Sequence, residues 1–190
     1  MLLSDREIKK YILEGKIKIK PLPNFKLQLS PASLDLRLGN EVRIFNNFRK
    51  TYIDPKNPKT FKNLTSLVKI KKAQPFVIQP AQFILASTLE EISLPEDIGA
   101  RIEGRSSWGR LGLIVHATAG YIDPGFRGRL TLEMSNIGPL PILLYPGMKI
   151  CQIAFEKLSS PAEIPYSKKK GSKYFGDIHP QESKIYKDFQ

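Results

Sequence analysis

Cysteine and histidine are scarce in this chain of 190 residues. A single cysteine, Cys151, excludes an intramolecular disulfide framework. With only His116 and His179 besides, the chain lacks the ligands for a structural zinc site built from cysteine and histidine. We therefore expect a protein of a reducing compartment that holds no zinc. His116 follows an apolar stretch, and we expect it to be a structural residue of that strand rather than a catalytic one.

Long apolar runs are also missing. No window of the sequence approaches the roughly 18 consecutive apolar residues of a membrane span. Residues 1–6 lack the basic and apolar regions of a signal peptide. These features predict a cytoplasmic protein without a membrane partner.

Acidic residues are few relative to basic ones, 18 against 30, and the net charge is +12. This excess favours an anionic partner such as a nucleic acid, a nucleotide or an anionic membrane, without choosing among them. A basic run at residues 49–72, with Asp54 as its one acid, is most simply a solvated face. A hydrophobic fraction of 41% is enough for the core of one domain.

Short apolar stretches separated by glycine and proline dominate the chain. Ser4 and Glu7 form a capping-box pattern, which predicts a helix over residues 5–14 that ends at Gly15. Residues 34–39 alternate in hydrophobicity and predict a strand that turns at Gly39-Asn40 toward a partner strand at 42–45. Further strands are predicted at residues 67–70, 75–78, 83–86, 98–102, 111–115, 130–134, 142–144 and 150–155. Such a series is typical of a mainly β barrel or jelly roll.

Residues 104–112 are rich in groups that bind phosphate. Arg105 and Arg110 offer planar guanidinium groups, Ser106 and Ser107 offer hydroxyl donors, and the glycines let a ligand approach the backbone. The segment is not a Walker loop, because no Gly-Lys-Ser/Thr follows. Composition alone leaves both a phosphate site and an ordinary polar turn open.

Two carboxylates further along the chain also have two readings. Asp123 precedes Pro-Gly, where an aspartate commonly starts a turn. Glu133 lies in an apolar strand and should share one face with Thr131 and Ser135, while Leu132 and Met134 face the other side. It is either an exposed strand residue or a partly buried acid–base group.

Several motifs together resemble the dCTP deaminases of the trimeric dUTPase superfamily. They are PASLDLRLG at residues 31–39, GRSS at 104–107, TAGYIDPGF at 118–126, TLE at 131–133 and GSKY at 171–174. The resemblance implies a distorted β jelly roll with a short N-terminal helix and a homotrimer with active sites between subunits. It also divides the chain into a β domain at residues 1–165 and a flexible basic lid at 166–190.

The resemblance implies a role for each matching residue in a zinc-independent deamination of dCTP at C4. Zinc deaminases instead use a His-x-Glu and a Pro-Cys-x-x-Cys, which a chain with one cysteine lacks. Glu133 matches the catalytic proton shuttle, and Ser106 and Arg110 match residues that position the water. The matching substrate-binding residues are Arg105 and Ser107 for the triphosphate, Thr118 and Ala119 for the pyrimidine, Phe126 for deoxyribose, and Tyr166 and Lys173 in the tail. Mg²⁺ would arrive with the substrate's phosphates, dCTP or dUTP, and no metal site of the protein is expected.

Three residues favour a bifunctional member of the family that continues from dUTP to dUMP and diphosphate. Gly120 stands where a histidine is expected in monofunctional enzymes, and Asp123 matches the aspartate that activates water for attack on the α-phosphate. Gln152, in PGMKICQ at residues 146–152, resembles a phosphate-contacting glutamine, although it could be an ordinary outward strand residue. Trp108 and Asp177 depart from the family pattern, since a leucine and a phosphate-binding glutamine are expected there.

Other functions remain as alternatives. A monofunctional deaminase would release dUTP, and a nucleotide-binding regulator would carry a degraded site, against which the intact Glu133, Ser106, Arg110 and Asp123 argue. Only the net charge suggests a nucleic-acid-binding module, and charge alone does not identify one. We therefore expect no nucleic-acid partner.

Overall fold

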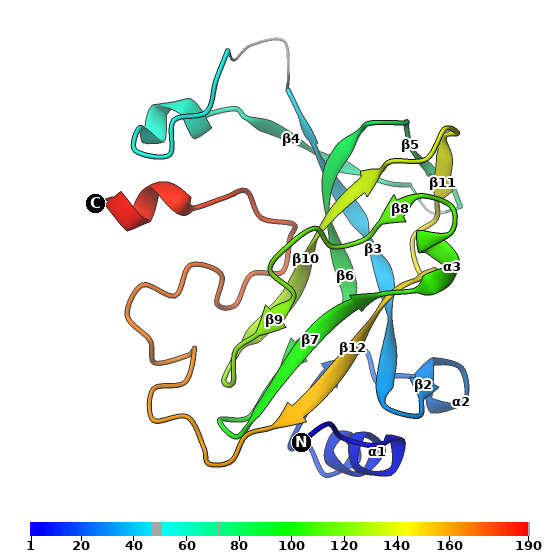
Figure 1. Cartoon of the computed structure of the whole chain (residues 1–190), viewed down its shortest axis with the longest axis vertical. Helices are drawn as coiled ribbons and strands as arrows, with labels where there is room; N and C mark the ends of the chain where they lie inside the picture. The colour runs from blue at the N-terminus through cyan, green and yellow to red at the C-terminus, as the bar shows by residue number, and fades with distance from the viewer. Residues whose placement is uncertain (47–50, 72, 190) are drawn as a thin grey trace.

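The fold is a strongly curled antiparallel sheet, as Figure 1 shows for a computed structural model that describes residues 1–46, 51–71 and 73–189. Seven strands follow one another in the order β8-β10-β6-β3-β12-β7-β9, and β1, β2 and β4 pair at its sides. This confirms the predicted mainly β class. The strands of this sheet are β1 (Lys18–Lys20), β2 (Leu29–Ser30), β3 (Ser33–Phe45), β4 (Thr65–Lys69), β6 (Phe83–Ser93), β7 (Ile98–Gly104), β8 (Leu113–Ile114), β9 (Tyr121–Ile122), β10 (Arg127–Asn136) and β12 (Lys149–Lys157), and β5 (Phe76–Ile78) pairs with β11 (Ile142–Leu144) apart from it.

The helices are short. The predicted N-terminal helix is α1 (Asp5–Leu13), where the Ser4 amide donates to Glu7 Oε2 at 3.2 Å and Gly15 follows with a φ of +74°. The remaining helices are α2 (Phe25–Gln28), α3 (Ser106–Gly109) and the 3₁₀ helices η2 (Pro58–Phe61) and η3 (Ile185–Phe189). None of the described helices is both long enough and apolar enough to span a membrane.

The turn predicted at Gly39-Asn40 is wrong, because β3 runs through it as one strand of 13 residues. Gly39 instead lies within the part of β3 that pairs with β6. A Cβ there would stand 2.9 Å from the Ser87 carbonyl oxygen of β6. The register between these strands shifts at the same place, between Leu38 and Val42. The glycine therefore marks a bulge with close backbone approach, which sequence spacing does not distinguish from a turn.

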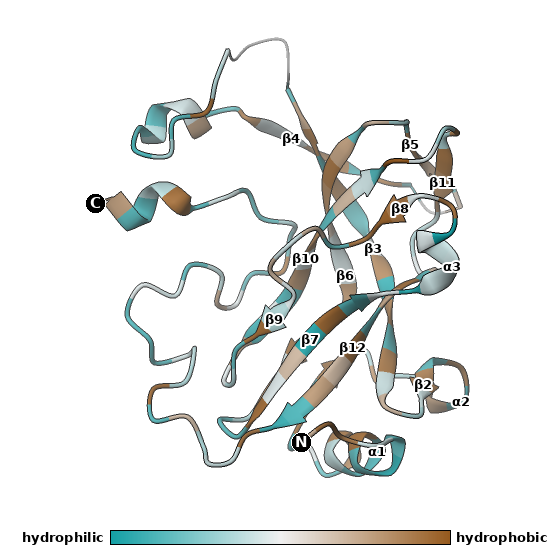
Figure 2. Cartoon of the chain, viewed as in Figure 1, coloured by the Kyte–Doolittle hydropathy of each residue, from teal (hydrophilic) through white to brown (hydrophobic). Residues whose placement is uncertain are grey.

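The core fills the inside of the curled sheet. Figure 2 shows apolar stretches along β3, β7 and β12, while the C-terminal segment is mostly polar. Cys151 of β12 is buried there, and burial, reinforced by the nearby carboxylates of Glu90 and Asp35, raises the pKa of its thiol far above the ordinary value. The thiol therefore stays protonated and acts as a small hydrophobic side chain.

The C-terminal tail, beginning at Tyr166, lies against the sheet rather than apart from it. The Gly176 amide donates to the Arg127 carbonyl at 2.7 Å, and the Arg129 amide donates to the Asp177 carbonyl at 2.8 Å, so the tail pairs with the start of β10. Figure 1 shows this segment, in orange and red, running along the open side of the sheet. The sequence predicts a tail that is mobile unless bound, and the structure holds it by specific contacts.

Candidate functional site

A cavity of about 530 Å³ lies between the sheet and the tail. It brings together Ala119, Asp123, Phe126, Glu133 and Tyr166, five residues that the sequence singles out. Most of its other walls are apolar, contributed by residues such as Ile102, Ile122, Leu130, Leu85, Phe83 and Phe61. A concave apolar pocket with a few converging polar groups is the usual form of a small-molecule site.

Glu133 points into this cavity from β10. Leu132 and Met134 are fully buried, whereas Thr131, Glu133 and Ser135 are half-buried on the opposite face, so the predicted alternation is confirmed. Thr118 Oγ1 donates to Glu133 Oε2 at 3.3 Å. The hydroxyl orients one carboxylate oxygen, and the other, with no bonding partner in the described part of the chain, can face a ligand.

The strip at residues 118–120 borders the cavity beside Glu133. The Gly120 amide donates to the Thr118 carbonyl at 3.1 Å, and the Gly120 carbonyl accepts from the Ile102 amide at 2.8 Å. A Cβ on Gly120 would lie 3.0 Å from the Ile102 carbonyl oxygen. A larger residue at this position would therefore require the strip to shift.

Asp123 starts a tight turn, as the sequence predicts, and also lines the cavity. Its carbonyl accepts from the Phe126 amide at 3.2 Å, and Gly125 within the turn has a φ of +79°. A Cβ on Gly125 would stand 2.6 Å from Pro165 Cβ, so only glycine lets the tail approach this closely. The structural and functional readings of Asp123 are therefore compatible.

Phe126 and Tyr166 form an aromatic wall of the cavity. Their ring centroids are 5.8 Å apart with an interplanar angle of 51°. Tyr166 is held in place because its amide donates to the Pro124 carbonyl at 2.8 Å and its hydroxyl accepts from the Tyr174 amide at 3.2 Å. The tail thus contributes a fixed side chain to the wall opposite the sheet.

The two charged tail residues of interest are both ion-paired within the tail. Asp177 lines the cavity, but its Oδ2 lies 3.0 Å from Lys184 Nζ, which balances its charge near any anionic ligand. Lys173 Nζ lies 2.5 Å from Asp188 Oδ2. Lys173 is not among the described residues that line the cavity.

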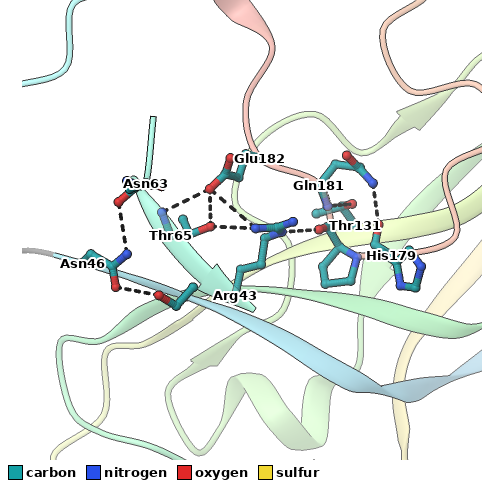
Figure 3. A network of polar contacts seen from close by, with 10 residues as sticks. Arg43, Asn46, Asn63, Thr65, Thr131, His179, Gln181 and Glu182 are labelled. Carbon is teal, nitrogen blue, oxygen red and sulfur yellow. Dashed lines mark hydrogen bonds and ion pairs between the residues drawn. The ribbon is translucent and has the colours of Figure 1, made fainter. Parts of the chain in front are cut away.

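Figure 3 shows how the far end of the tail is anchored. Arg43 Nε of β3 donates to the Pro180 carbonyl at 2.6 Å, and Arg43 Nη1 lies 3.5 Å from Glu182 Oε1. Glu182 also accepts from the amide and the hydroxyl of Thr65, and the Gln181 amide donates to Thr131 Oγ1 at 3.1 Å. Contacts with β3, β4 and β10 therefore fix the segment that closes one side of the cavity.

A second group of predicted residues gathers elsewhere, where β7 leads into α3. Ser106, Ser107 and Arg110 are exposed there. Gln152 Nε2 donates to the Gly104 carbonyl at 3.1 Å, which ties β12 to the start of this segment. Trp108 Nε1 donates to the Lys149 carbonyl at 3.0 Å, so this departure from the family pattern anchors the segment through its indole.

The two groups do not meet within one chain. None of residues 105–110, all of which are described, lines the cavity that holds Glu133. Figure 1 shows α3 at one side of the molecule and the tail at the other. The structure therefore separates the predicted phosphate-binding segment from the predicted catalytic carboxylates.

His116 is closer to the site than its sequence position suggests. The sequence favours a structural histidine on an apolar strand, but His116 lies beyond the end of β8 and lines the cavity. Both ring nitrogens are buried, and neither has a hydrogen-bond partner among the described residues. Neighbouring apolar residues in the sequence hide this placement.

The described part of the chain contains no group of three or more His, Cys, Asp or Glu side chains that could hold a metal ion. Asp123 and Glu133 are the only carboxylates among the sequence-predicted site residues.

Comparisons with known proteins agree on one family. Residues 2–158 match the sequence model of a family described as dCTP deaminase-like. The chain is 52% identical to a "dCTP deaminase, dUMP-forming" of Dictyoglomus thermophilum, an alignment that covers 100% of this chain and 97% of the relative. It is also 52% identical to a protein of the same name from Methanothermobacter thermautotrophicus, with 100% and 96% covered. Among solved structures, the 2'-deoxycytidine 5'-triphosphate deaminase of Agrobacterium tumefaciens superposes with a TM-score of 0.63 at 27% identity, over 82% of this chain and 47% of that longer one.

Proposed function

The chain belongs to the dCTP deaminase family, and from that premise we propose how its residues convert dCTP to dUMP. The enzyme deaminates dCTP at C4 and carries the product on to dUMP. The observation that supports this role for the cavity is that it gathers Asp123, Glu133 and the distant tail residue Tyr166 around one apolar space.

Deamination requires a water made nucleophilic and protons delivered to N3 and to the departing ammonia. A single carboxylate can perform both tasks, taking a proton from water and returning it to the pyrimidine. Glu133 lies in the cavity with one carboxylate oxygen oriented by Thr118 Oγ1, and unlike Glu182 it forms no ion pair with an arginine among the described residues. The net reaction is dCTP plus water to dUTP plus ammonia, with Ser106 and Arg110 steadying the water and the substrate.

Hydrolysis of dUTP uses the second carboxylate. Asp123 activates a water that attacks the α-phosphorus, and diphosphate leaves. Mg²⁺ enters as part of the substrate, bound to the triphosphate, and reduces its charge during this step. The ion-paired Asp177 lies in the same cavity without adding an unbalanced negative charge.

We propose that the complete site forms between subunits of a homotrimer. The segment with Arg105, Ser106 and Arg110 is exposed and remote from the cavity of its own chain. In a closed cyclic assembly each copy of this segment can face the cavity of its neighbour. The tail from Tyr166 onward acts as the lid that excludes water.

Incubation with dCTP and Mg²⁺, followed by chromatography of nucleotides and assay of ammonia, tests the reaction. We expect dUMP and diphosphate in equal amounts, with little free dUTP, because both carboxylates line one cavity. Stoichiometric accumulation of dUTP would leave a monofunctional deaminase, and nucleotide binding without turnover would leave a regulator.

The same assay with CTP tests the choice of sugar. Phe126 is nearly buried and is braced by Tyr166, so its ring cannot move aside for a 2'-hydroxyl. We expect CTP to turn over about 100-fold more slowly than dCTP, the scale of discrimination that an apolar pocket reaches against one added hydroxyl. Comparable rates with the two nucleotides would show that Phe126 does not select the sugar.

Mixing two inactive variants tests the shared site. Glu133→Gln and Ser106→Ala damage different halves of the proposed site, so a co-expressed mixture should contain some sites with both halves intact. Random assembly into a cyclic oligomer would restore about a quarter of the sites. Each variant expressed alone is the control. A mixture as inactive as its components would place both halves within one chain.

A further inference from the structure

A buried carboxylate joins two cations beside the phosphate-binding segment. Asp35 lies on β3, and its side chain is 7% exposed. Its Oδ1 lies 3.1 Å from Arg105 Nε, and its Oδ2 lies 3.0 Å from Lys149 Nζ. Because β3, β12 and β7 are neighbours in the sheet, Asp35 of β3 and Lys149 of β12 lie beside Arg105, which directly follows β7.

The triad is supported from behind by a second buried acid. Glu90 is fully buried and accepts from Arg37 Nε at 2.7 Å and from the Arg37 amide at 2.8 Å. Gln28 Nε2 donates both to Glu90 Oε1, at 3.2 Å, and to the Asp35 carbonyl, at 2.9 Å. Burying a carboxylate without partners costs free energy. The ion pairs of Asp35 with Arg105 and Lys149 avoid that cost and hold the Asp35 side chain in one position.

The arrangement leaves positive charge available at the surface. Asp35 neutralises one of its two cations, and the pair of Arg37 and Glu90 is neutral. The side chains of Arg105 and Lys149 are 29% and 37% exposed, so both can reach a ligand. Two like charges held together repel each other, and an anion bound between them relieves that repulsion. The proposed ligand at this segment, a triphosphate, is such an anion.

We propose that Lys149 is a further ligand of the substrate's phosphate chain, and that Asp35 is the positioning residue that holds Lys149 and Arg105 side by side. This inference rests on the proposed function, since it assigns residues to the triphosphate of that substrate. Lys149 Nζ shares Asp35 with Arg105, and Gln152 Nε2 donates to the Gly104 carbonyl, so both side chains of β12 border the same segment.

The number of phosphates on the ligand provides the test for Lys149. Calorimetry would compare dUMP with a non-hydrolysable α,β-imido analogue of dUTP, each with Mg²⁺. Lys149→Ala should weaken binding of the analogue about tenfold or more, the worth of one charge-assisted hydrogen bond, and should change dUMP binding much less. Lys157→Ala, at the exposed far end of the same strand, is the matched control and should change neither.

The sign of the effect tests Asp35. If its charge alone mattered, Asp35→Asn would remove a negative charge near the phosphates and strengthen binding of the analogue. A positioning role predicts the opposite, a loss of similar size to that of Lys149→Ala. Should Asp35→Asn fail to fold, a cycle of Arg105→Ala, Lys149→Ala and the double variant replaces it, and the two losses should be non-additive.

Each measured result supports or overturns one of the two assigned roles. Equal losses for dUMP and the analogue, or no loss, would overturn the role of Lys149. Tighter binding in Asp35→Asn, or additive losses in the cycle, would overturn the role of Asp35. If the unmodified protein bound neither nucleotide, the proposed function itself would fail, which is a distinct result.

Discussion

Glu133→Gln is expected to lower the rate of dCTP deamination by about 10⁴-fold, the upper end of the range for a general acid–base group. Glutamine keeps the size of the side chain and can still accept from Thr118 Oγ1, but it cannot carry a proton. One carboxylate serves several proton transfers in this reaction, so no other step compensates for its loss. Single-turnover measurement of ammonia release would give the rate.

The same variant should still bind dCTP and hydrolyse some added dUTP, because we assign that water to Asp123. Ser135→Ala is the matched control, since Ser135 lies on the same half-buried face of β10. Asp123→Asn should show the reverse pattern, with deamination spared and dUTP accumulating, because the turn uses the backbone carbonyl of residue 123, which asparagine keeps. Retention of a tenth or more of the deamination rate by Glu133→Gln would show that another group moves the protons.

Removal of the tail is expected to lower the turnover rate strongly while leaving the sheet folded. A chain that ends at Pro165 keeps the bond from the Ala162 amide to the Glu96 carbonyl but loses Tyr166 and the anchored segment that closes the cavity. The loss should reach about 10²-fold or more, since mispositioned substrates lose rate on this scale. Steady-state rates and a thermal unfolding curve would be measured together.

Single variants separate loss of the tail from loss of its anchor. Glu182→Gln weakens the contacts with Arg43 and Thr65 but keeps every tail residue, so we expect a smaller loss than truncation causes. Lys187→Ala changes an exposed residue of η3 and should leave the rate unchanged. Full activity in the chain that ends at Pro165 would show that the tail is no lid.

Local patterns predicted much of this fold because they depend on neighbours in sequence. The alternation around Glu133 and the capping pattern at Ser4 each involve residues a few positions apart, and both appear in the structure. The pattern at Gly39 predicts a turn wrongly, because a turn and a bulge both favour glycine. Only the pairing of β3 with β6, with its shift of register, identifies the bulge. Short elements such as β1 and β9 carry too few residues for a periodic signal.

The site was harder to predict because its residues meet through the sheet. Asp35, Arg105 and Lys149 are far apart in the chain, and nothing in their spacing shows that β3, β12 and β7 are neighbours. His116 was assigned by its apolar neighbours, although the loop beyond β8 carries it into the cavity. The anchoring of Pro180 and Glu182 by Arg43 likewise depends on where the tail returns to the sheet.

The tail also sets when a newly made chain can become active. Gln181, Glu182, Ser183 and Ile185 line the cavity, yet they follow β12, the last strand of the sheet, in the chain. The sheet can form as the chain emerges, since its last strand, β12, ends at Lys157. Translation that stops early, or a protease that cuts the exposed tail near Lys168, therefore yields a folded protein without a closed site. Nucleotide conversion is in this way reserved for chains in which the tail has been made and kept.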